Sequence, residues 1–188
     1  MAFRKAGLGL VIAGLVLAGC EKKEPDAETN AAIAAKTAAP RTQFIGLPNG
    51  ATISVEPGSI GQKMATYLAS SEPAPRSFEI GGEQFADWSA TAKPEIRAMV
   101  PGLVELLKSY PDVKLRIEGH SDNVGGVDKN MKISQSRADM AKRYLTDAGV
   151  SDARIEAVGK GMAEPIADND TVEGRARNRR IELVIVEK

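Results

Sequence analysis

Apolar and polar residues alternate most regularly along residues 113–120, VKLRIEGH. Val113, Leu115 and Ile117 fall on one face of this predicted strand, and the residues between them are charged. Such alternation is typical of a strand that is buried on one side only. The pattern predicts further strands over residues 154–159 and 180–188, and an interrupted strand that begins at Phe78.

Helical periodicity fills the intervals between these strands. Residues 91–109 have it, but Pro101 lies in the middle, where a proline costs about 3 kcal/mol, so we expect a kink or two separate pieces. A second helix is predicted from about residue 131 to 148, closed by Gly149, and a short turn over 173–178. The order β-α-β-α-β-(α)-β predicts an α+β fold, a two-layer sandwich with helices on one face of a mixed four-stranded sheet.

The first 19 residues have the features of an export signal. Arg4 and Lys5 precede an uncharged stretch over residues 6–19. As a helix this stretch spans roughly 21 Å, less than the ~30 Å hydrocarbon core of a bilayer. A basic start, a short apolar run and small residues at its end favour a cleaved signal peptide, with a retained membrane anchor as the alternative.

The residues that follow resemble the lipobox of bacterial lipoproteins. Leu17, Ala18 and Gly19 precede Cys20, which is the only cysteine of the chain. The resemblance implies cleavage before Cys20 and attachment of lipid (palmitate among its acyl chains) to that residue. Glu21 stands where an Asp would indicate retention in the inner membrane, so the outer membrane is favoured, with the folded part in the periplasm.

Residues 20–43 are rich in alanine, charge and proline and are predicted to be a flexible tether behind the lipidated cysteine. Residues 44–76 form a predicted small prelude to the main domain. It comprises a hairpin around Pro48-Asn49-Gly50 and a short helix capped by Ser59. The main domain is predicted to span residues 77–188.

Charge balance and residue spacing argue against nucleic-acid binding and against two kinds of metal site. Lys and Arg together balance Asp and Glu, 25 against 25, so bulk charge gives no sign of nucleic-acid binding. The polar stretch over residues 120–140 does not fit an EF-hand loop. If Asp122 were the first position of such a loop, Val124 and Gly126 would be the third and fifth, which must supply oxygen ligands. His120 and Asp122 have no second His or available Cys to complete a transition-metal site.

Enzymatic chemistry also finds no support. Asn123 stands where a nucleophile elbow around Ser121 needs its second Gly, and the only His is the neighbour of that Ser. No catalytic residues and no cofactor are therefore predicted, and His120 itself is interpreted as a bystander. A lone His at the end of a strand is more often at the surface or hydrogen-bonded than a ligand.

Arg137 occupies an unexpected position. On a helical wheel it falls within an apolar arc that includes Ile133, Met140 and Tyr144. Arg is almost never buried unless it is paired, so we expect an acid opposite it, with Asp122 or Asp128 as candidates. The pair could be a structural ion pair. It could instead be a ligand site, in which an Arg fork and a carboxylate together hold a zwitterion such as an amino-acid head group.

The motifs of residues 77–188 resemble the OmpA-like C-terminal domain family, which includes the Pal lipoproteins and the periplasmic domain of MotB. They are IEGHSDNVGG, then N-x-x-I-S-x-x-R-A from residue 130, and finally G-R-x-x-N-R-R-I-E from residue 174. The resemblance implies non-covalent, non-catalytic binding of peptidoglycan through the diaminopimelate of its stem peptide. The residues that it assigns to this site are Asp122, Arg137, Asn130, Ile133, Ser121 and Arg179.

The chain departs from the family at Phe85-Ala86-Asp87-Trp88, where Trp88 lies near a position that usually holds Asn or Asp. The overall expectation is an outer-membrane lipoprotein that ties the membrane to the cell wall. The alternative is an interaction or signalling module that uses the same fold to hold a periplasmic protein partner, with residues 44–76 as the docking segment.

Overall fold

The computed structural model describes residues 42–81, 91 and 93–188. The predicted signal peptide, Cys20, nearly all of the tether and the departure around Trp88 lie outside these residues. Within the described residues, no helix is both long enough and apolar enough to span a bilayer.

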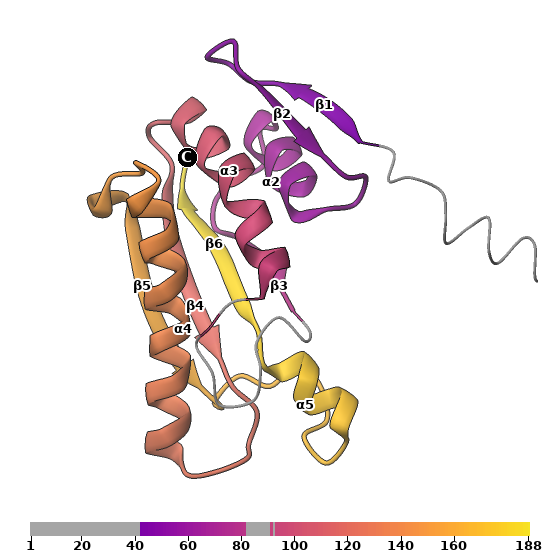
Figure 1. The fold of residues 1–188 in the computed structure, drawn as a ribbon, viewed down its shortest axis with the longest axis vertical. Helices are drawn as coiled ribbons and strands as arrows, with labels where there is room; N and C mark the ends of the chain where they lie inside the picture. Colours follow the sequence, from indigo (N-terminus) through magenta and orange to yellow (C-terminus); the bar gives the residue numbers. More distant parts are fainter. Residues whose placement is uncertain (1–41, 82–90, 92) are drawn as a thin grey trace, which may run out of the picture. The chain divides into compact units, whose positions relative to one another are not determined.

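A mixed four-stranded sheet forms the centre of the domain (Figure 1). Its strands lie in the order β3 (Arg76–Ile80), β6 (Ile181–Glu187), β4 (Lys114–His120) and β5 (Ile155–Gly161). β4 and β5 are parallel, whereas β6 is antiparallel to both of its neighbours. The predicted mixed sheet and the α+β class are therefore confirmed.

Three helices accompany the sheet: α3 (Pro94–Ser109), α4 (Val127–Asp147) and the short α5 (Val172–Asn178). A 3₁₀ turn, η1 (Asp152–Arg154), leads into β5. α4 packs on β4 and β5, and α3 packs on α4. The buried aliphatic residues of the strands and of these two helices form one core.

Two helix predictions need correction. α3 is a single helix that contains Pro101, so of the two expected alternatives, a kink or two separate pieces, the second is wrong. Burial of Leu103, Leu106 and Leu107 beyond the proline favours continuation of the helix. α4 begins at Val127, four residues before the predicted start. Val127, Asp128 and Lys129 are exposed, so no apolar stripe marks this part of the helix in the sequence.

The prelude has the elements that the sequence predicts. β1 (Gln43–Gly46) pairs with β2 (Thr52–Val55), and α2 (Ile60–Ala69) follows. Ser59 caps α2, since its hydroxyl oxygen accepts a hydrogen bond from the backbone N–H of Gln62 at 3.3 Å. α2 packs on β3 and α3, and its buried residues belong to the same core as the sheet.

Glycines allow α4 to approach the sheet very closely. A Cβ at Gly119 of β4 would overlap the backbone carbonyl of Ser134, and one at Gly159 of β5 would lie 2.7 Å from the backbone nitrogen of Gln135. In this space the helix side chains bond to β5. The N–H of Gly161 donates to the Ser134 hydroxyl at 2.9 Å, and that of Gly159 donates to the Gln135 amide oxygen at 2.7 Å.

This packing predicts the effect of adding one methyl group. Gly119→Ala should lower the free energy of unfolding by about 1–3 kcal/mol, the usual cost of overpacking a core. The matched control is Gly102→Ala in α3, where a Cβ meets nothing within 4 Å and should stabilise the helix by about 0.5–1 kcal/mol. Urea unfolding of the two variants measures the difference. Equal stability of the two would contradict the close approach of α4.

Candidate functional site

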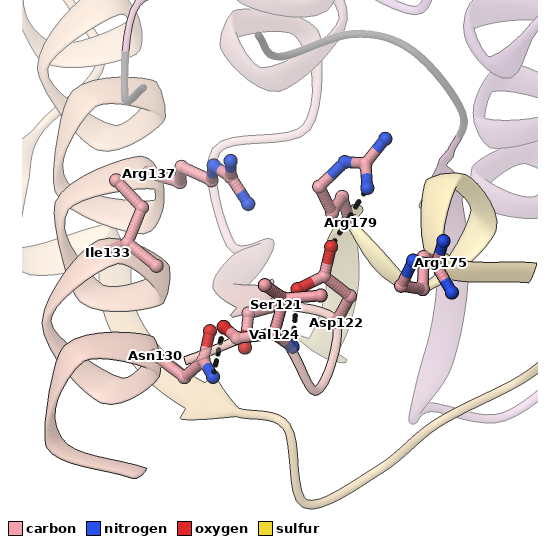
Figure 2. Close-up of a pocket in the computed structure, with 8 residues that line it drawn as sticks. All are labelled: Ser121, Asp122, Val124, Asn130, Ile133, Arg137, Arg175 and Arg179. Atoms are coloured by element: carbon pink, nitrogen blue, oxygen red, sulfur yellow. Dashed lines mark hydrogen bonds and ion pairs between the residues drawn. The ribbon is translucent and has the colours of Figure 1, made fainter. Parts of the chain in front are cut away.

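A cavity of about 100 Å³ opens where β4 ends, between the N-terminal half of α4 and α5 (Figure 2). It brings together all six residues that the family motifs assign to the ligand, together with Val124 and Arg175. The lining consists of Ser121, Asp122, Val124, Asn130, Ile133, Arg137, Arg175 and Arg179. These residues come from three segments of the chain that are far apart in the sequence.

Asp122 lies just after the end of β4, and both of its carboxylate oxygens have partners. One carboxylate oxygen forms an ion pair with Nη1 of Arg179 at 2.8 Å. The other accepts a hydrogen bond from the backbone N–H of Val124 at 3.1 Å, which is the geometry of an Asx turn. The side chains of Asp122 and Arg179 are only 10% and 16% exposed, so this charge pair is well shielded from solvent. The carboxylate therefore has a fixed orientation next to the cavity.

Arg137 lies almost completely inside the protein, with 1% of its surface exposed. It extends from α4 into the cavity, toward the side occupied by Asp122 and Arg179 (Figure 2). Its Nη1 donates to the backbone carbonyl of His120 at 3.4 Å. Of the two acids considered as partners for it, Asp122 lines the cavity, whereas Asp128 is exposed in the first turn of α4.

Asn130 fixes the loop between β4 and α4. Its side chain is fully buried, and Nδ2 donates to the backbone carbonyl of Val124 at 3.1 Å. Within the described parts of the chain, Oδ1 of Asn130 and Oγ of Ser121 are buried and have no hydrogen-bond partner. Half-buried Ile133 adds an apolar surface to the lining. The cavity thus presents two buried polar atoms that a ligand could satisfy.

α5 supplies positive charge that the sequence argument only partly identified. Arg175 and Arg179 are four residues apart and therefore share one side of the α5 segment. Arg175 donates to the backbone carbonyl of Asn169 at 2.8 Å and lines the cavity, although it was not among the predicted site residues. The i,i+4 spacing of Arg175 and Arg179 within G-R-x-x-N-R-R could have indicated that both side chains face the same site. With three guanidinium groups and one carboxylate, the described lining favours an anionic group.

His120 contributes to this site through its backbone and not through its ring. The residue is 1% exposed, so the expectation of a surface or hydrogen-bonded side chain is wrong. Neither ring nitrogen has a hydrogen-bond partner within the described residues. Burial, together with the nearby Arg180 guanidinium, lowers the pKa of His120 to about 4. The imidazole is therefore neutral at pH 7.

Comparison with known proteins places the cavity in a recognised domain. The OmpA family matches residues 84–179, just over half of the 188-residue chain. The probable lipoprotein YiaD of Escherichia coli is 43% identical over 101 residues, which cover 54% of this chain and 46% of that protein. The peptidoglycan-binding protein ArfA of Mycobacterium tuberculosis is 38% identical over 101 residues, 54% of this chain and 31% of that protein. The matched segment thus spans less than half of either relative.

Solved structures share the architecture. The peptidoglycan-associated lipoprotein of Burkholderia pseudomallei is 30% identical with a TM-score of 0.51, covering 60% of this chain and 90% of that one. A putative MotB-like protein of Desulfovibrio vulgaris is 25% identical with a TM-score of 0.57, covering 69% and 90%. On the family match and the shared fold, the chain belongs to the OmpA family, whose members of this type are not enzymes.

Proposed function

We propose that the cavity binds peptidoglycan non-covalently, through the diaminopimelate residue of its stem peptide. The observation that carries this proposal is the buried guanidinium of Arg137, which lines a cavity beside the fixed carboxylate of Asp122. An anion in the cavity could form charge-assisted hydrogen bonds with this guanidinium, which are stronger than hydrogen bonds between neutral groups.

The chemistry of the lining suits a zwitterion with an additional carboxylate. Arg137 can grip a carboxylate through two parallel N–H bonds. The carboxylate of Asp122 has lone pairs beyond those used by Arg179 and Val124 and can accept a hydrogen bond from an ammonium group. The buried Asn130 oxygen and Ser121 hydroxyl provide further partners. Diaminopimelate in a stem peptide offers both a free carboxylate and a free ammonium.

The relatives support the same class of ligand. The names of the Mycobacterium tuberculosis protein and of the Burkholderia pseudomallei structure both refer to peptidoglycan. The segment of this chain that matches the OmpA family, residues 84–179, contains the cavity residues Asp122 and Arg137. We infer that the cavity serves the same ligand here.

We further propose that the chain is a lipoprotein that ties the outer membrane to the cell wall. The lipobox-like Leu17-Ala18-Gly19-Cys20 supports a lipid at Cys20. Among the relatives, YiaD is named a probable lipoprotein, and YfiB of Pseudomonas aeruginosa, 37% identical over 92 residues, is named an outer-membrane lipoprotein. Several acyl chains hold a protein in a bilayer almost permanently, at about 0.8 kcal/mol per buried CH₂.

Charge-removing variants test the binding site. Asp122→Asn and Arg137→Gln should each weaken binding by about tenfold or more, because a hydrogen bond to a charged group contributes about 1.5–3 kcal/mol. Co-sedimentation of the mature protein with purified peptidoglycan sacculi measures the loss. Asp147→Asn and Arg143→Gln are matched controls, since both side chains are exposed on α4 and neither lines the cavity.

Circular dichroism and thermal unfolding of these variants distinguish loss of binding from loss of fold. If the folded Asp122→Asn and Arg137→Gln proteins pellet as the controls do, the assignment of the site is wrong. If Asp122→Asn unfolds while the controls do not, the Asp122–Arg179 pair is chiefly structural.

Soluble stem peptides test the identity of the ligand. A muramyl tripeptide that ends in diaminopimelate should bind at least about tenfold more tightly than the same peptide ending in lysine, which lacks one carboxylate and hence one charged partner for the arginines. Isothermal titration calorimetry at low salt gives both affinities. Equal affinity for the two peptides would show that the extra carboxylate does not reach Arg137, Arg175 or Arg179.

Replacing the lipidated residue tests the anchor. Cys20→Ser should remove the protein from the outer-membrane fraction, because without the lipobox cysteine no acyl chain is attached and the apolar stretch over residues 6–19 is not cleaved off. Sucrose-gradient fractionation and immunoblotting follow the shift. Because the cavity is distant in sequence from residue 20, the variant should still co-sediment with sacculi. Continued residence in the outer membrane would argue against lipidation at Cys20.

A further inference from the structure

A second cluster of potential ligands lies at the end of β4, on the side of the sheet opposite α4. Gly119 faces α4, so its neighbours Glu118 and His120 point to the other side of the strand. Glu164, from the segment that follows β5, joins them. One ligand atom from each of the three residues lies within 4.8 Å of the others.

The imidazole of His120 is the unusual member of this cluster. It is 1% exposed, and neither ring nitrogen has a hydrogen-bond partner among the residues that the structure describes. The nearest carboxylate oxygen, on Glu182, lies 3.6 Å from Nε2. That oxygen already receives two bonds from Arg180, at 2.7 and 2.8 Å. Buried polar groups normally have a partner, so a buried imidazole beside two carboxylates indicates a missing one.

The two carboxylates already hold a cation between them. The Lys160 ammonium lies 3.0 Å from Glu164 and 3.7 Å from Glu118. Its side chain is 28% exposed and ends on a flexible stem, so it can turn out into solvent. The position between the two carboxylates therefore favours positive charge, and the Lys160 ammonium can leave it.

We propose that Glu118, His120 and Glu164 form a binding site for Zn²⁺, and that the ion displaces the Lys160 ammonium. An imidazole nitrogen with two carboxylate oxygens is a donor set that zinc accepts, whereas Ca²⁺ and Mg²⁺ prefer oxygen ligands alone. The exposed Glu164 side chain can move to close the ligand distances. A fourth position remains for water. Bound zinc would fasten the segment after β5 to the end of β4.

Calorimetric titration of ZnCl₂ tests this site in the mature chain, carrying Cys20→Ser to remove the thiol and bearing no histidine tag. One ion should bind per chain. His120→Gln and Glu164→Gln should each weaken binding by at least about tenfold, as loss of even an outer partner of a metal ligand does. Lys160→Met should strengthen binding, because it removes the competing charge.

The controls separate a built site from general attraction to acidic groups. Glu173→Gln replaces an exposed glutamate outside the cluster and should leave the zinc affinity unchanged, and MgCl₂ should give no binding at the same concentrations. Zinc should also raise the unfolding temperature of the wild type, since it binds the folded state. The proposal is overturned if the wild type binds no zinc, if Glu164→Gln binds as the wild type does, or if Lys160→Met fails to strengthen binding. Should His120→Gln unfold, the Glu164 and Lys160 variants decide alone.

Discussion

The close approach of α4 to β4 and β5 is the constraint on which the rest of this domain depends. Gly119 and Gly159 leave no side chain between the helix backbone and the sheet. Ser134 and Gln135 then bond directly to backbone N–H groups of β5. One turn further along the same helix, Arg137 reaches the end of β4 and donates to the carbonyl of His120. The position of the buried guanidinium is thus a consequence of glycine packing.

The electrostatic character of the cavity follows from this arrangement. Arg137 enters from α4, whereas Arg175 and Arg179 enter from α5 and Asp122 from the end of β4. Because Arg179 is engaged by Asp122 at 2.8 Å, this pair orients the carboxylate without cancelling the excess of positive charge around the cavity. Such a lining can recognise a ligand that carries both signs of charge but more negative than positive groups.

Most of the fold could be predicted from the regular spacing of apolar residues in the sequence. The alternation over residues 113–120 predicted β4, and the helical wheel singled out Arg137 because its neighbours Ile133 and Met140 are apolar. The start of α4 at Val127 was not predictable in this way, since the exposed residues 127–129 leave no apolar stripe. Gly126 caps the helix with an extended backbone and no side-chain hydrogen bond, so the stronger Ser, Thr, Asp or Asn signal is absent there.

Which charged side chains form ion pairs could not be predicted from the sequence, because the fold decides which of them meet. Asp122 and Arg179 are 57 residues apart, and β4 and β6 must be neighbours in the sheet before these side chains can meet. The family motif identified both residues but did not say that they pair. The neighbours of His120 are likewise distant in sequence: Glu182 on β6 lies 3.6 Å from its Nε2, and Arg180 binds that carboxylate. No local pattern around residue 120 could reveal them.

The end of β4 therefore serves two sides of the molecule at once. Gly119 faces α4, while Glu118 and His120 face the opposite side, where Lys160 and Glu164 lie. The backbone carbonyl of His120 nevertheless bonds to Arg137, and Ser121 and Asp122 follow directly. A change at Glu118 or Glu164 that shifts the His120 backbone would also move its carbonyl, which accepts the hydrogen bond from Arg137. The same short strand end therefore supplies side chains to the Glu118–His120–Glu164 cluster and a backbone acceptor to the cavity.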